Sequence, residues 1–128
     1  VALLKDVRIG LHPETSSERI VFEFSGALPQ ARVEYVADVQ QCAEGSVIPV
    51  AGEEVLRITF LDAAAHDSVG KSTFDKQTVA GGSKPITEAK QFCDFENELG
   101  WAAGVTGMKP FIVSTLANPP RLVIDIKQ

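Results

Sequence analysis

The sequence predicts an all-β fold: a single-domain antiparallel β-sandwich of about seven or eight strands over residues 1–128. Short runs alternate apolar and polar residues with the period of a strand, and they are rich in β-branched and aromatic residues. Glycines and prolines separate these runs. No long window carries the apolar period of an amphipathic helix. A chain of 128 residues is long enough for one domain with its own hydrophobic core.

The expected strands follow one another along the chain, and most have one apolar face. They are residues 3–11, 19–26, 31–36, 54–61, 100–107, 111–116 and 121–126. Their apolar faces carry, in order, Leu3, Val7, Ile9 and Leu11; Ile20, Phe22 and Phe24; Val33 and Tyr35; Leu56, Ile58 and Phe60; Trp101, Ala103 and Val105; and Leu122, Ile124 and Ile126. The strand at 111–116 is apolar on both faces. Alternation of this kind predicts a sheet with one face packed on a core.

Three segments depart from this regular pattern. Pro119 and Pro120 predict an extended entry into the last strand, because proline has no N–H to give to a strand ladder. Residues 86–97 are compatible with a strand or a short helix, since their central residues favour helix. Residues 63–84 are the longest stretch without strand character, and a loop of that length is usually functional or mobile.

Charge and hydropathy argue against several classes of partner. The formal net charge is −5 and no basic patch stands out, so neither nucleic acid nor an anionic membrane surface is an expected partner. No apolar run is long enough to span a bilayer. The first residue is Val1 rather than an initiator methionine, so we expect a processed or trimmed chain, with any signal peptide or lipid anchor upstream.

The motifs that carry chemistry are incomplete. SVGKST (68–73) is similar to the end of a phosphate-binding loop, but Ala65 stands where the motif needs its first glycine, and no helical pattern follows. The adjacent residues 66–68, His-Asp-Ser, cannot converge as a catalytic triad. Neither His12 nor His66 has a neighbour at metal-ligand spacing. We therefore expect no catalytic residue, no metal and no cofactor.

Five stretches together resemble a known family. They are DVRIGLH (6–12), ERIVFEFSG (18–26), ARVEYV (31–36), GEEVLRITF (52–60) and GMKPFIVSTLANPPRLVIDI (107–126). Their order and spacing resemble the AMIN-like domain of exported actinobacterial proteins, which are often lipoproteins. That family is similar to the AMIN domain attached to N-acetylmuramoyl-L-alanine amidases and to outer-membrane secretins.

The resemblance implies a β-sandwich, an exported location in the cell envelope and a non-catalytic role. The expected partner is peptidoglycan or another envelope glycan. The alternative is a protein-interaction domain of an exported lipoprotein, which would hold an envelope protein through an exposed strand or through residues 63–84. Because the fold alone does not determine function, this expectation is by analogy.

Two cysteines, Cys42 and Cys93, match no zinc or redox spacing. The exported location that the resemblance implies favours a disulfide between them. The alternative is a pair of buried thiols that never meet.

The resemblance fixes no ligand-binding residue, so the candidates come from residue chemistry. Trp101 and Tyr35 are the only tryptophan and tyrosine, and exposed rings of this kind stack on sugars. If they are buried, both are core residues. Arg121 and Asp94 are the polar groups expected beside them.

Overall fold

The computed structural model describes all residues, 1–128, and is built almost entirely from strands. The strands are β1 (Ala2–His12), β2 (Ser17–Ser25), β3 (Gln30–Val36), β4 (Val39–Gln40), β5 (Val47–Ile48), β6 (Glu54–Leu61), β7 (Ala63–Ala64), β8 (Thr78–Ala80), β9 (Ile86–Phe95), β10 (Glu98–Val105), β11 (Phe111–Leu116) and β12 (Arg121–Lys127). A single 3-10 turn, η1 (Pro13–Thr15), follows β1. The all-β class is confirmed, whereas the expected count of seven or eight strands is wrong, because there are twelve.

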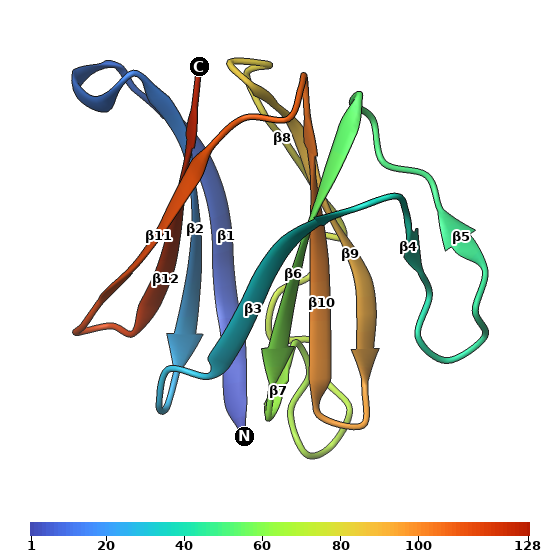
Figure 1. Cartoon of the computed structure of the whole chain (residues 1–128). Coiled ribbons are helices and arrows are strands. Elements are labelled where there is room, and N and C mark those ends of the chain that lie inside the picture. Colours follow the sequence, from blue (N-terminus) through green and yellow to red (C-terminus); the bar gives the residue numbers. More distant parts are fainter.

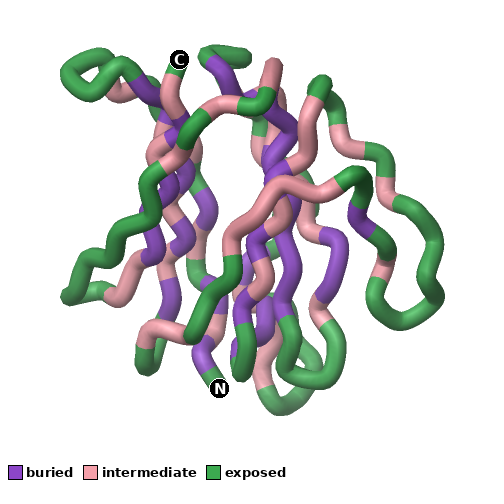
Figure 2. The backbone as a smooth tube through the Cα atoms, viewed as in Figure 1, coloured by how far each residue is buried: buried purple, intermediate pink, exposed green.

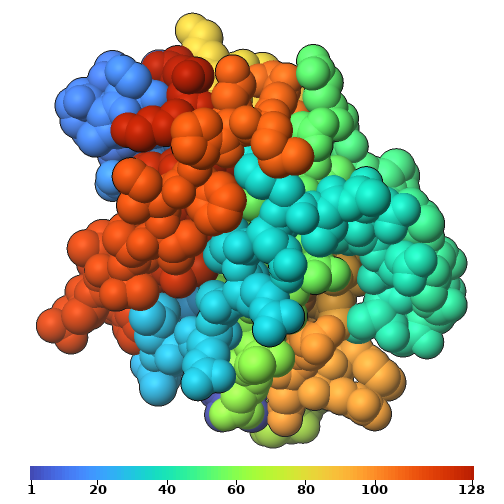
Figure 3. Space-filling view, in the orientation of Figure 1, coloured from blue at the N-terminus to red at the C-terminus, as the bar shows by residue number.

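Two five-stranded sheets and one small hairpin make up the fold (Figure 1). One sheet has the order β11-β12-β2-β1-β7, and the other has the order β3-β6-β10-β9-β8. The β4–β5 hairpin forms a separate small sheet on one side of the molecule, as Figure 3 also shows. Neighbouring strands run antiparallel, except that β7 pairs in parallel with β1. No helix has the length and apolar character needed to cross a membrane.

The hydrophobic core joins the two large sheets. Phe60 of β6 packs edge-to-face against two rings of β2, with centroid distances of 5.1 Å to Phe22 and 4.9 Å to Phe24. In Figure 2 the buried residues run along the strands of both sheets. Most residues expected on apolar faces are buried, including Ile20, Phe22, Phe24, Leu56, Ile58, Phe60, Trp101, Ala103, Val105, Leu122, Ile124 and Ile126. The alternation of polar and apolar residues therefore identified the core.

The first strand departs from its expected face. The pairing of β1 with β2 shifts register between Leu4 and Asp6, which is a β-bulge. A bulge inserts one residue and exchanges the two faces of the strand beyond it. As a result Leu4 and Val7 share the buried face, whereas Leu3, which we expected inside, is only half-buried. Leu11 lies on the face of Val7 but is 46% exposed, at the end of the strand.

Residues 63–84 contain strands that the sequence did not indicate. The segment includes β7 and β8, and Phe74 lies against Trp101 with a ring-centroid distance of 6.1 Å. The expectation of a stretch without strands is therefore wrong at 63–64 and 78–80. Between them the buried Phe74 attaches the segment to the core. Strands of two or three residues are too short to show a period of two.

Residues 86–97 form strand β9 and the turn that follows it, not a helix. Glu96 and Asn97 have φ values of 51° and 62° and make the two-residue turn into β10. Positive φ at both positions suits the twist of a tight hairpin. The turn places Phe95 directly opposite Glu98.

A disulfide joins the β4–β5 hairpin to β9. Cys42 and Cys93 are bonded, so the expected pairing is confirmed. The hairpin covers part of the outer face of the second sheet, where Val39, Phe92 and Ala102 form a small buried cluster with Cys93. The disulfide thus fixes the hairpin over this cluster.

Candidate ligand-binding surface

Trp101, the first residue expected to bind a ligand, lies inside the core. It comes from the inward face of β10 and is 0% exposed. Its ring packs edge-to-face against Phe22 with a centroid distance of 5.9 Å. A stacking platform needs an open aromatic face, so the burial of Trp101 favours the alternative interpretation, a core residue.

Tyr35 is half-buried and connects the two sheets at one edge. Its hydroxyl donates a hydrogen bond to the Lys109 carbonyl at 2.6 Å and accepts one from the Lys109 backbone N–H at 3.1 Å. Its ring packs edge-to-face against Phe111, with centroids 5.8 Å apart. Burial raises the pKa of the Tyr35 phenol. These contacts tie β3 to the start of β11.

Asp94 and Arg121 both hold backbone segments. Asp94 accepts a hydrogen bond from the Ala65 N–H at 3.1 Å and contacts His66 Nδ1 at 2.8 Å. Arg121 donates two hydrogen bonds to carbonyl oxygens of the turn at 117–120. The structure therefore does not bring the four expected residues to one surface.

Another surface, the outer face of the second sheet, gathers polar side chains. Directly opposite residues of antiparallel strands share a face, so the register arranges these side chains in rows. From β3 across β6 and β10 to β9, the rows are Gln30–Leu61–Glu98–Phe95, then Arg32–Thr59–Gly100–Cys93, then Glu34–Arg57–Ala102–Lys90. The opposite face of these strands carries the core, so the rows face outward.

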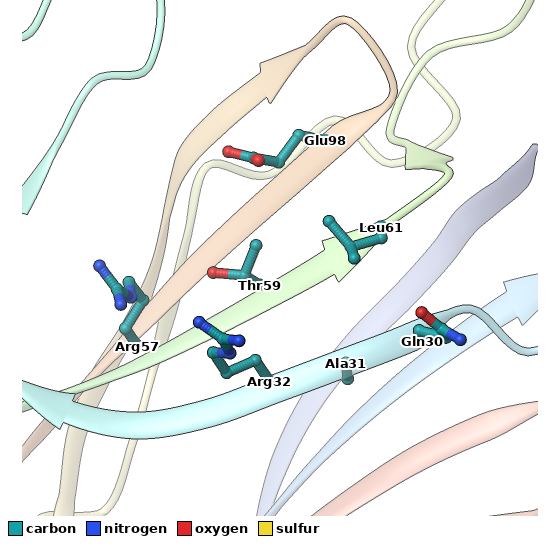
Figure 4. Close-up of a pocket in the computed structure, with 7 residues that line it drawn as sticks. All are labelled: Gln30, Ala31, Arg32, Arg57, Thr59, Leu61 and Glu98. Carbon is teal, nitrogen blue, oxygen red and sulfur yellow. The ribbon is translucent and has the colours of Figure 1, made fainter.

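A hollow of about 470 Å³, which we call the outer-face pocket, lies on this surface. Its lining residues are Gln30, Ala31, Arg32, Arg57, Thr59, Leu61 and Glu98. The hollow exists because the short Thr59 is surrounded by the long side chains of Arg32, Arg57 and Glu98, which share its side of the sheet (Figure 4). Beside Thr59, Gly100 adds no side chain, and the ring of Phe92 occupies the space above it.

Two guanidinium groups lie at one end of the outer-face pocket. Arg57 forms an ion pair with Glu34 at 2.8 Å, and this hydrogen bond holds the pKa of the Glu34 carboxyl below its ordinary value. The Nε of Arg57 is buried and has no hydrogen-bond partner. Arg32 is exposed and makes no ion pair or side-chain hydrogen bond with the chain. Its five N–H donors are therefore free to meet a ligand.

The other end of the outer-face pocket is acidic and apolar. Glu98 lies between two exposed apolar side chains of its row, Leu61 at 51% and Phe95 at 48% exposure. Phe95 thus offers an exposed aromatic ring beside polar groups, which is the arrangement that we expected at Trp101.

Sequence reasoning missed these residues for a definable reason. The outward polar positions Arg32, Arg57 and Thr59 belong to strands whose alternation was recognised. These residues come together only because their strands are neighbours and pair in a particular register. The local sequence pattern indicates neither the strand order nor the register. Phe95 belongs to residues 86–97, for which the sequence is compatible with either a strand or a short helix, so its outward position could not be predicted.

The histidines form no complete catalytic group with serine. His66 contacts the Asp94 carboxylate, but no serine hydroxyl is hydrogen bonded to the His66 ring. The Ser72 hydroxyl instead donates to the Phe74 carbonyl at 2.9 Å. No group of three or more His, Cys, Asp or Glu side chains is arranged to hold a metal ion.

The SVGKST segment does not have the features of a phosphate site. The Asp67 carboxylate accepts hydrogen bonds from the backbone N–H groups of Val69 and Lys71, at 3.0 Å and 2.9 Å. A phosphate loop needs such N–H groups free for its anion, followed by a helix. Here they serve an internal turn and no helix follows.

The fold and the outer-face pocket together describe a small all-β chain with a polar, hollowed surface on one sheet. The chain belongs to the AMIN-like domain family, whose family model matches residues 2–128. The resemblance inferred from the five sequence stretches is thereby confirmed at the level of the family. No curated protein and no solved structure gave a significant match.

Proposed function

We propose that residues 1–128 form one β-sandwich domain that binds peptidoglycan or another envelope glycan without changing it chemically. The observation that carries this proposal is the outer-face pocket with the exposed ring of Phe95 beside it. Membership of the AMIN-like family, whose domains are in general non-catalytic and associated with peptidoglycan, supports the same role.

The surface has the chemistry that glycan binding needs. An exposed aromatic ring such as Phe95 offers an apolar face to the C–H groups of a sugar ring. Gln30 and Thr59 can donate to and accept from sugar hydroxyl and acetamide groups. Few polar groups at fixed positions beside an apolar surface are typical of ligand sites.

Co-sedimentation with purified peptidoglycan tests the proposal. We expect the native domain to sediment with the polymer and Phe95→Ala to bind about threefold to tenfold more weakly. Leu11→Ala, which removes an exposed apolar side chain from the other sheet, is the matched control and should bind as the native domain does. Absence of native binding would contradict the proposal, and release of soluble muropeptides would contradict the non-catalytic role.

The alternative is a protein-interaction domain, and β11 favours it. This edge strand is uncharged and exposes Ile112, Val113 and Leu116 at 56%, 41% and 46%. An edge of this kind can pair with an extended strand of an envelope protein. If Ile112→Lys abolishes retention of an envelope protein while peptidoglycan binding is absent, the alternative is supported.

We further propose an exported location with a lipid anchor outside residues 1–128. The Cys42–Cys93 disulfide supports export, because such bonds persist in oxidising compartments. The anchor and an actinobacterial source come only from the resemblance to exported lipoproteins. Fractionation of source cells, with mass spectrometry of the mature N-terminus, tests both export and lipidation.

A further inference from the structure

We infer that the outer-face pocket recognises the peptide stem of peptidoglycan through a stem carboxylate, rather than the sugar chain alone. This inference rests on the proposed function and names the part of the polymer that the pocket contacts. Neutral sugar hydroxyl groups need no guanidinium, whereas stem peptides carry free carboxylates.

The position of Arg32 carries the inference. A guanidinium group matches a carboxylate through two parallel N–H···O hydrogen bonds. Arg32 is exposed and has no internal partner, while the diagonal neighbour Arg57 is held by Glu34 at 2.8 Å. Because Glu34 neutralises Arg57, Arg32 supplies both the unpaired positive charge and the free donors.

The acidic residues restrict which anions fit. Glu34 balances Arg57, and Glu98 closes the opposite end of the pocket, so the site is not a general polyanion patch. A polymer with a phosphate at every unit would place a second phosphate near Glu98 and be repelled there. A peptide with one carboxylate and a nearby amine satisfies both ends, because the amine can pair with Glu98.

The arrangement also allows sugar and peptide to bind together. Phe95 and Arg32 lie in adjacent rows, on strands three positions apart, so their backbones are about 15 Å apart. A sugar ring against Phe95 therefore leaves room for its attached peptide to cross the sheet toward Arg32. We assign the sugar to Phe95 and the carboxylate to Arg32.

Two polymers and matched variants test the inference. Co-sedimentation is measured with intact peptidoglycan and with peptide-free strands of poly-N-acetylglucosamine, which carry acetamide sugars but no carboxylate. Amidase-treated peptidoglycan does not serve here, because the cut leaves a free lactyl carboxylate on each muramic acid. We expect the native domain to bind intact peptidoglycan about tenfold more tightly than the peptide-free strands, as for loss of a hydrogen bond to a charged group. Arg32→Gln should reduce binding to intact peptidoglycan to the level of the peptide-free strands and leave binding to those strands unchanged.

The controls separate charge, geometry and folding. Arg8→Gln removes one positive charge from β1 of the other sheet and should bind as the native domain does. Arg32→Lys keeps the positive charge but cannot form two parallel hydrogen bonds to a carboxylate, so it should bind with intermediate affinity. Thermal unfolding confirms that each variant is folded, which we expect because Arg32 has no internal partner.

The outcomes distinguish the two proposals. If the native domain binds both polymers equally, or if Arg32→Gln weakens both equally, the peptide-stem inference is overturned while the proposed function stands. If the native domain binds neither polymer, the proposed function fails and the inference fails with it. Preferential binding to phosphate-rich wall polymer, measured as a third arm, would overturn the inference in favour of a general anion site.

Discussion

Glu18 is a buried carboxylate that connects the two sheets. It belongs to β2, is 2% exposed, and accepts hydrogen bonds from the backbone N–H groups of Gly82, Lys84 and Ile86 at 2.5, 2.9 and 2.8 Å. Gly82 and Lys84 lie between β8 and β9 of the other sheet, and Ile86 is the first residue of β9. A buried charge is tolerated when its oxygens are fully hydrogen bonded.

Replacement of Glu18 should therefore destabilise the fold strongly. Glu18→Ala leaves three N–H groups without their acceptor, and we expect it to lower the free energy of unfolding by about 3 kcal/mol or more. Glu18→Gln keeps one acceptor oxygen but places its NH2 group against a backbone N–H, where two donors meet. We expect it to lower the free energy of unfolding by about 1–2 kcal/mol. Urea unfolding measures the stability of both variants. If Glu18→Ala is as stable as the native domain, the hydrogen bonds accepted by Glu18 contribute nothing to stability.

Tyr35 gives a prediction with a clean spectroscopic signal, because it is the only tyrosine. Burial raises the pKa of its phenol above the ordinary value of about 10. The folded state then holds the proton more tightly than the unfolded chain. The contribution of protonated Tyr35 to the free energy of unfolding is therefore fully present below the pKa of the unfolded chain. It is lost as pH rises through the higher pKa of the folded state.

We expect the phenolate absorbance of the native domain to develop at higher pH than that of the urea-unfolded chain. Tyr35→Phe keeps the ring contact with Phe111 and should abolish the signal in both states. A native titration at or below the unfolded one would contradict the burial of Tyr35.

At the scale of elements, the β4–β5 hairpin depends on its covalent link. Its two strands have two residues each, too few to be stable alone. The hairpin packs on a small cluster over β10, where Ala102 leaves room for Val39 and Phe92. On the same strand Gly104 leaves room for the Ala51 carbonyl, so small outward residues let the chain lie on the sheet.

Removal of the disulfide should loosen this element and destabilise the whole fold. The bond joins residues separated by 51 positions, and chain entropy for such a loop predicts a loss of roughly 4 kcal/mol or less. For the double variant Cys42→Ser and Cys93→Ser we expect lower stability in urea and faster amide exchange at Val39 and Gln40 than in β6. Unchanged exchange at these amides would show that packing alone holds the hairpin.

The elements also show how far sequence alone reaches. The run 54–61 matched β6 residue for residue, because its alternation indicates both its bounds and its buried face. The run 111–116 matched the bounds of β11, but it is apolar on both faces and none of its residues is buried, so its pattern indicated no buried face. The strands β4, β5, β7 and β8 have two or three residues, and their pairing depends on partners distant in sequence. The outer-face pocket escaped prediction for the same reason, since Thr59 lies beside Gly100 only in the folded sheet.

At the scale of the whole molecule, the sole tryptophan reports on contact between the sheets. Trp101 of β10 packs against Phe22 of β2 with a centroid distance of 5.9 Å, so its environment changes when the sheets separate. Far-UV circular dichroism follows the strands themselves. The two probes together therefore ask whether residues 1–128 behave as one cooperative unit.

If the chain is one domain, we expect both probes to follow the same transition in urea, with one midpoint and one slope. The physical reason is that Phe22, Phe60 and Trp101 belong to a single core shared by both sheets, so neither sheet keeps a buried face without the other. Loss of tryptophan burial at a lower urea concentration than loss of strand signal would mean that one sheet persists alone, which contradicts a single domain. The Tyr35→Phe variant sharpens the measurement, because it removes the Tyr35–Lys109 hydrogen bonds at the edge of the core and should move both midpoints together.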